Sequence, residues 1–213
     1  MTLLLYFLSS FSVVIAVLIS FFILSKADKR FLPFILLLYI GLITELINRY
    51  LDTIGMDSQI STNIYALFEI LLITWLFTNW GFFKDPGKSI WLCFLFITVY
   101  IADIFFLPKL HYYTPYFNIF SSLVLVIMSI LTINKVILDE NKSLVKSATF
   151  LICIAFIIHF TNLALVEIFY IYGLTQGITL AARIYDIFQV MNLVTNLIYA
   201  LAIIWIPRKY SLI

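Results

Sequence analysis

Seven apolar stretches of roughly twenty residues each follow one another along this 213-residue chain. A helix needs about 20 mainly apolar residues to cross a bilayer, because each residue advances it by only about 1.5 Å. Helices are the expected conformation, since they pair every backbone group within the span. We therefore predict an all-α, polytopic integral membrane protein, a seven-transmembrane-helix bundle in contact with the lipid bilayer. The predicted spans are 3–25, 31–53, 61–83, 90–108, 112–135, 145–170 and 178–206.

The composition supports one transmembrane domain over residues 1–213. Apolar residues make up 64% of the chain and charged residues 11%, and the mean hydropathy is +1.11. Polar stretches between the spans reach only about ten residues, which is too short for a soluble domain. Span 3–25 is interpreted as a retained helix, because no Lys or Arg precedes it and it is too long for a signal peptide. A six-span alternative would fuse the fourth and fifth spans across Pro108, Lys109 and His111, which oppose it.

The basic residues predict the orientation of the bundle. Ten of the thirteen fall on one side of the predicted membrane, and only Arg49, Lys109 and Arg183 fall on the other. Cytoplasmic loops carry such an excess, so we predict the N-terminus outside and the C-terminus inside, in a multi-pass protein of the plasma or bacterial inner membrane. The ten are Lys26, Lys29, Arg30, Lys84, Lys88, Lys135, Lys142, Lys146, Arg208 and Lys209.

All eight ionisable residues inside the spans fall in the predicted outer half, and the inner halves carry none. Such groups are costly in a membrane, so their clustering predicts a polar pocket that opens outward. The eight are Glu45, Arg49, Glu69, Asp103, His159, Glu167, Arg183 and Asp186. The candidate ligand-binding residues are Glu45, Arg49, Glu69, Asp103, His159, Asn162, Arg183, Asp186, Gln189 and Asn192.

Glu69 is the strongest single candidate. It lies about 12 Å below the start of its span, too deep for a short carboxylate to reach the interface easily. It must be protonated, paired with a cation or placed beside water, unless it is a neutral group bonded to a neighbouring helix.

Structural alternatives accompany the other candidates. Glu45 and Arg49, one turn apart, form an ion pair in a polar cavity or extend outward at the interface. Asp103 is either a pocket acid paired with an arginine or an interfacial cap. His159 is either a proton carrier or a structural hydrogen-bonding residue.

The sequence leaves three functions open. It contains no nucleotide, metalloprotease or hydrolase motif, and its two Cys and two His lack metal-site spacing, so we predict no metal, cofactor or nucleic-acid partner. The favoured hypothesis is a small-ligand binding or sensing module that acts through a partner protein, which assigns no catalytic residue. The alternatives are a carrier of small solutes, coupled to protons through Glu69 or His159, and an intramembrane acid–base enzyme acting on a lipid or isoprenoid. That enzyme would pair Glu69 with Asp103 or Asp186.

Overall fold

The computed structural model describes residues 9, 11–106, 113–139, 143–176 and 178–208; side chains at 106, 139 and 172–186 lie outside this description. It confirms the all-α fold, and the β pairing among these residues is a single bridge between Ala27 and Arg208. Two short 3-10 turns accompany the α-helices, η1 (Lys29–Phe31) and η3 (Leu144–Lys146). The α-helices are α2 (Val13–Ile23), α3 (Leu32–Thr53), α4 (Gln59–Asn79), α5 (Pro86–Phe106), α6 (Pro115–Asp139), α7 (Ala148–Gln176) and α8 (Ile178–Ile204).

The helix bounds follow the predicted spans closely. Among the described residues, six helices are long and apolar enough to cross a membrane, namely α3 to α8. The seventh, α2, is a shorter apolar helix, and residues 1–8 of the predicted span 3–25 lie outside the described residues. Helix α5 ends at Phe106 and α6 starts at Pro115, so the fourth and fifth spans are separate helices and not one fused span.

Proline and glycine set several of these boundaries. Prolines stand in the first turn of α3, α5 and α6, where the missing N–H has no helical partner to lose. Gly55 and Gly81 follow the ends of α3 and α4 with φ of +71°, the left-handed conformation that commonly terminates a helix.

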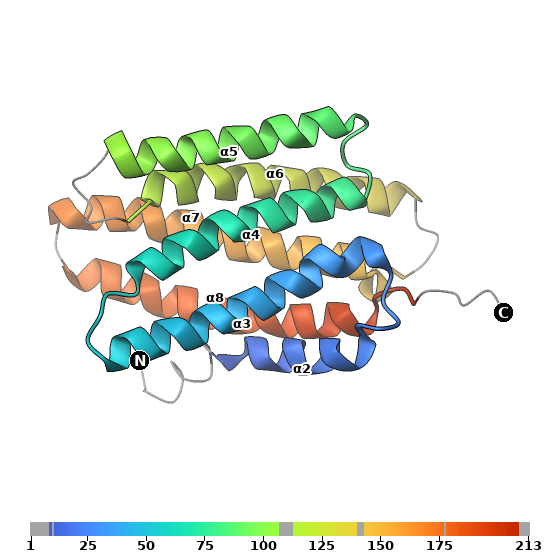
Figure 1. Cartoon of the computed structure of the whole chain (residues 1–213), viewed down its shortest axis with the longest axis horizontal. Helices are drawn as coiled ribbons and strands as arrows, with labels where there is room; N and C mark the ends of the chain where they lie inside the picture. The colour runs from blue at the N-terminus through green and yellow to red at the C-terminus, as the bar shows by residue number, and fades with distance from the viewer. Residues whose placement is uncertain (1–8, 10, 107–112, 140–142, 177, 209–213) are drawn as a thin grey trace.

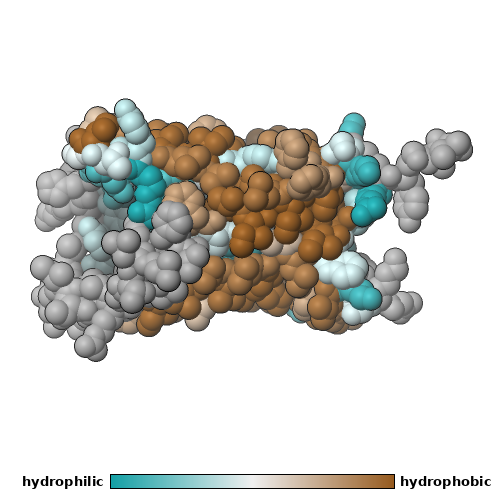
Figure 2. Space-filling view, turned by 90° about the horizontal axis from the view of Figure 1, so that it is seen from below, coloured by the Kyte–Doolittle hydropathy of each residue, from teal (hydrophilic) through white to brown (hydrophobic). Residues whose placement is uncertain are grey.

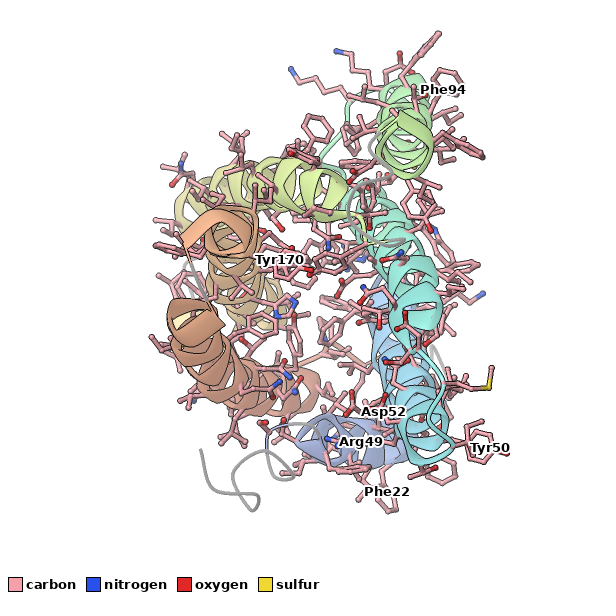
Figure 3. The ribbon with its side chains drawn as sticks, turned by 90° about the vertical axis from the view of Figure 1, so that its left-hand side faces the viewer. Phe22, Arg49, Tyr50, Asp52, Phe94 and Tyr170 are labelled. Atoms are coloured by element: carbon pink, nitrogen blue, oxygen red, sulfur yellow. The ribbon has the colours of Figure 1, made fainter. Side chains whose placement is uncertain are left out.

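The helices form a ring rather than a solid cluster (Figures 1 and 3). In ring order α2 packs against α3, α3 against α4, α6 against α7, α7 against α8, and α8 returns to α2. Helix α5 lies outside the ring and bridges α4 and α6, which contact each other only slightly. The side chains seen at the centre of Figure 3 therefore come from helices far apart in the sequence.

The turns that carry Lys and Arg residues lie at one end of the bundle, here called the basic end. The backbone N–H of Asp28 donates to Pro207 O at 2.9 Å, and Lys135 Nζ lies 3.5 Å from Gly81 O. Lys146 Nζ lies 5.5 Å from the ring centroid of Trp205. These contacts join the α2–α3 turn, the α4–α5 turn, the C-terminal part of α6, the η3 turn and the C-terminal end of α8. A hydrophobic belt separates this basic end from the opposite end (Figure 2), as expected of a protein that spans a bilayer.

Aromatic side chains fill the bundle interior on the basic side. Phe31 packs on Trp80 at 5.6 Å between centroids, Trp80 on Phe77 at 5.5 Å, and Phe77 on Phe156 at 6.2 Å. Phe156 then contacts Tyr199 at 6.0 Å, and Phe34 contacts Tyr199 at 5.3 Å. This aromatic stack packs the interior of the ring on the basic side.

The orientation is testable with two exposed turn residues at opposite ends, Met56 after α3 and Lys84 before α5. We expect Met56→Cys to react with a membrane-impermeant maleimide on intact cells, and Lys84→Cys to react only after permeabilisation, because the excess of basic residues predicts that the end with Lys84 is cytoplasmic. Labelling would be read by gel shift against the unsubstituted chain. Labelling of Lys84→Cys but not of Met56→Cys on intact cells would show that the orientation is the opposite of the predicted one.

Candidate ligand-binding cavity

A cavity of about 570 Å³ occupies the half of the ring opposite the basic end. Six of the ten residues proposed from the sequence line it: Glu45, Arg49, Glu69, His159, Gln189 and Asn192. They come from four helices, and Figure 3 looks onto this end, with Arg49, Asp52 and Tyr170 toward the interior and Phe22, Tyr50 and Phe94 pointing away. Polar residues widely spaced in the sequence are thus brought together.

The other four proposed residues are placed differently. Asp103 does not line the cavity; its Oδ2 accepts a hydrogen bond from the backbone N–H of Phe117 at 2.7 Å, and so caps the first turn of α6. Asn162 also stays off the cavity, because its side-chain amide donates to Ile158 O, one turn earlier in α7, at 2.7 Å. The side chains of Arg183 and Asp186 lie outside the described residues.

The mouth of the cavity is built by α3 and α4. Arg49 Nε and Glu45 Oε1 are 3.3 Å apart in the ion pair expected from their spacing, and each side chain is 30% exposed. Asn48 donates to Thr62 Oγ1 at 3.2 Å and accepts a hydrogen bond from Ser61. The short α3–α4 turn and these bonds fix the two helices as one wall.

Glu69 lies deep on that wall. It is 8% exposed and stands ten residues after the start of α4, about 15 Å along the helix at 1.5 Å per residue. Tyr65, one turn nearer the mouth, donates its hydroxyl to Glu69 Oε1 at 3.1 Å. Among the described residues this phenol is the only hydrogen-bond donor to the carboxyl, and no basic side chain is paired with it. Glu69 therefore faces the cavity without a counter-charge from the described part of the chain.

A second buried acid, Glu167, faces the cavity from α7. It is fully buried, and its Oε1 accepts hydrogen bonds from Tyr113 Oη at 2.5 Å and Asn118 Nδ2 at 2.8 Å. Its Oε2 is buried and has no hydrogen-bond partner among the described residues. Both donors to this carboxyl are neutral, so Glu167 also lacks a positively charged partner within the described part of the chain.

Helices α7 and α8 line the cavity with side-chain amides and with the aromatic residues His159 and Phe188. The His159 ring packs against Phe160 and Phe188, at 5.0 and 5.8 Å between centroids. Gln189 Oε1 accepts a hydrogen bond from Ser9 Oγ at 2.6 Å, and Asn196 Nδ2 donates to Ser12 Oγ at 2.7 Å. Two serines of the first span thus hold the amides of α8 in place.

A smaller chamber of about 50 Å³ continues the cavity downward. Glu69, His159, Asn192 and Asn196 line both spaces, whereas Tyr199 lines only the chamber. Tyr199 also contacts Phe156 in the aromatic stack, so the chamber lies between the cavity and that stack.

Sequence reasoning missed several cavity residues. Tyr65 precedes Glu69 by four residues, and this helical spacing was a usable signal for their hydrogen bond. Tyr113 and Asn118 meet Glu167 across 54 and 49 positions, and no local pattern announces such pairs. Gly41 also lines the cavity, where its missing side chain leaves room for Tyr65.

The charge balance of the lining is acidic. Its described residues include four carboxylates, from Glu45, Asp52, Glu69 and Glu167, and one guanidinium, from Arg49, which is paired with Glu45. Three tyrosines, Tyr65, Tyr113 and Tyr170, add electron-rich ring faces. Such a lining can hold a cationic group by charge and by cation–π contact.

Comparisons with known proteins provide no relative for this chain: no family model matches it, and no curated protein or solved structure matches it significantly.

The close approach of Gly41 to Tyr65 gives a test of the deep wall. A Cβ at Gly41 would lie 3.3 Å from Tyr65 Oη, so Gly41→Ala should displace the hydroxyl from Glu69. We expect Gly41→Ala to be less favourable in the native background than in Tyr65→Phe, by about 0.5–1 kcal/mol in a double-mutant cycle of unfolding free energies. Additive effects would show that the two residues are independent.

The hydrogen bond from Phe117 N–H to Asp103 provides a second test, this time of the packing of α5 against α6. Asp103→Ala removes the acceptor for Phe117 N–H and should lower the free energy of unfolding by about 1–2 kcal/mol. Asp103→Asn keeps an acceptor oxygen and should lose less. Thermal unfolding in detergent measures both variants, and an unchanged stability in Asp103→Ala would refute the cap.

Proposed function

We propose that this chain is a ligand-binding membrane protein whose outward-facing cavity recognises a small organic cation. The observation that carries this proposal is the charge balance of the cavity. The one guanidinium among its described lining residues, from Arg49, is paired with Glu45, while Glu69 and Glu167 have only neutral partners within the described part of the chain. A buried carboxylate without a counter-charge is strongly destabilised in a low-dielectric site. A ligand that brings a positive charge compensates for that loss.

The size and chemistry of the cavity support the same ligand class. A volume of about 570 Å³ lies within the usual range for small-molecule sites. Tyr65 and Tyr170 offer ring faces, and the amides of Gln189 and Asn192 offer hydrogen bonds to the rest of a polar ligand. An amine or quaternary ammonium group toward Glu69, with a polar remainder toward the mouth, fits this distribution.

Binding from one side favours a sensing module over a carrier or an enzyme. The aromatic stack from Tyr199 to Phe31 fills the interior beneath the cavity, and a carrier would have to open this packing in each cycle. In this proposal the protein lies in the plasma or bacterial inner membrane with its cavity outward. A partner protein, contacting the basic cytoplasmic end, receives the signal of occupancy.

Choline is a suitable probe, because its neutral carbon isostere has the same shape without the charge. Unfolding of purified protein in potassium phosphate can be followed with a thiol-reactive dye, since Cys153 is buried and free. We expect choline to stabilise the protein more than the isostere does. Glu69→Gln should weaken choline binding about tenfold or more, corresponding to at least about 1.4 kcal/mol.

Asp57→Asn is the matched control. Asp57 is an exposed acid at the same end of the bundle that does not line the cavity, and Asn keeps the oxygen that accepts from Gln59 N–H. It should leave choline binding unchanged. Equal stabilisation by choline and its isostere, or by choline in the native chain and Glu69→Gln, would contradict the proposed function. Choline uptake into liposomes that stops in Glu69→Gln would instead identify a carrier.

A further inference from the structure

Half of the residues that line the chamber beneath the cavity carry side-chain oxygens, namely Tyr65, Glu69, Asn192, Asn196 and Tyr199. We propose that this chamber binds a sodium ion, held by the Glu69 carboxylate and by side-chain oxygens of α4 and α8. The ligand cavity is a separate, larger space above it, and the ion would be a second occupant of the protein. No Cys or His spacing predicted this site, because sodium is a hard cation that prefers oxygen ligands.

Hydrogen bonding around the chamber leaves oxygen lone pairs available. Asn196 uses its amide N–H₂ on Ser12, so its carbonyl oxygen remains for another partner. Tyr65 donates its proton to Glu69 and keeps its own lone pairs. Neither Asn192 nor the Tyr199 hydroxyl has a hydrogen-bond partner among the described residues. Side chains with available neutral oxygens and one acid therefore line the same chamber.

Burial makes unsatisfied groups expensive at this position. Glu69 and Tyr199 are each 8% exposed and Asn196 is 6% exposed. An unsatisfied polar group in such a place is destabilising, and a charged group is more so. A bound cation accepts electron pairs from all of these oxygens at once and also neutralises the carboxylate.

Size and charge select the ion. The chamber, at about 50 Å³, holds a few water-sized species at the roughly 10–15 Å³ that each requires, and a quaternary ammonium group does not fit. A single carboxylate matches one monovalent charge, whereas calcium sites usually use several carboxylates and magnesium keeps several of its waters. Sodium with one or two waters meets both conditions.

The direct test compares sodium with potassium in the absence of choline. Unfolding temperatures are measured over a series of NaCl concentrations, replaced by KCl at constant ionic strength, in the purified full chain. We expect stabilisation specific to sodium, with its midpoint raised about tenfold or more in Glu69→Gln and about threefold or more in Tyr199→Phe, according to the hydrogen-bonding strength removed.

Tyr39→Phe is the matched control for the tyrosine change. It removes a buried phenolic hydroxyl that has no hydrogen-bond partner among the described residues, and Tyr39 does not line the chamber. It should keep the full response to sodium. Equal effects of sodium and potassium on the native protein, or a sodium response unchanged in either Glu69→Gln or Tyr199→Phe, would overturn the proposal. Should Glu69→Gln fail to fold, Tyr199→Phe decides alone.

One consequence rests on the proposed function. Since Glu69 lines both the cavity and the chamber, sodium and choline would share one carboxylate, so each should weaken the affinity of the other by the same factor. Choline binding without any sodium effect would remove the chamber site and leave the cavity function intact. A sodium effect without choline binding would remove the proposed cavity function and leave the chamber site intact.

Discussion

A carboxyl group enclosed by helices inside a bilayer requires a compensating proton, cation or set of hydrogen bonds, and the polar half of this bundle is organised around two such groups. Glu69 on α4 and Glu167 on α7 line the same cavity, and each receives hydrogen bonds from neutral side chains only, among the described residues. The two donors to Glu167, Tyr113 and Asn118, link α6 and the residues just before it to α7. The acids therefore influence the local packing. Because a buried carboxylate is stabilised by a nearby positive charge, both proposals place a cation beside Glu69.

The interior of the bundle is aromatic near its basic end and polar in the other half, where the cavity lies. On the basic side, an aromatic stack runs through the interior from Phe31 to Tyr199. On the other side, the amides of α8 are held by serines of the first span, and α3 is held to α4 through Asn48. Helix α5 stands outside the ring but contributes Asp103, whose carboxylate caps α6 and so fixes the helix that supports Asn118.

Properties set by short stretches of chain were predictable from the sequence. Length and apolarity defined six membrane-spanning helices to within a few residues, and helical spacing gave the Glu45–Arg49 pair. The rotation and register of one helix against another are not encoded locally, so Asp103 was placed in the pocket although it caps a neighbouring helix. Asn162 was expected there too, but its amide bonds to its own helix. Pairs such as Tyr113 and Glu167 depend on the same long-range packing and gave no sequence signal.

In the proposed arrangement, polar side chains converge on a water-accessible cavity that opens away from the basic end. Two positions on α8 distinguish this cavity from the lipid-facing surface: Asn192 lines the cavity, and Val194 is exposed on the outer surface of the helix. A small hydrophilic thiol reagent applied to intact cells should modify Asn192→Cys rapidly and Val194→Cys very slowly, because lipid covers the second position. Equal rates at the two positions, or faster modification of Val194→Cys, would contradict the cavity and everything derived from it.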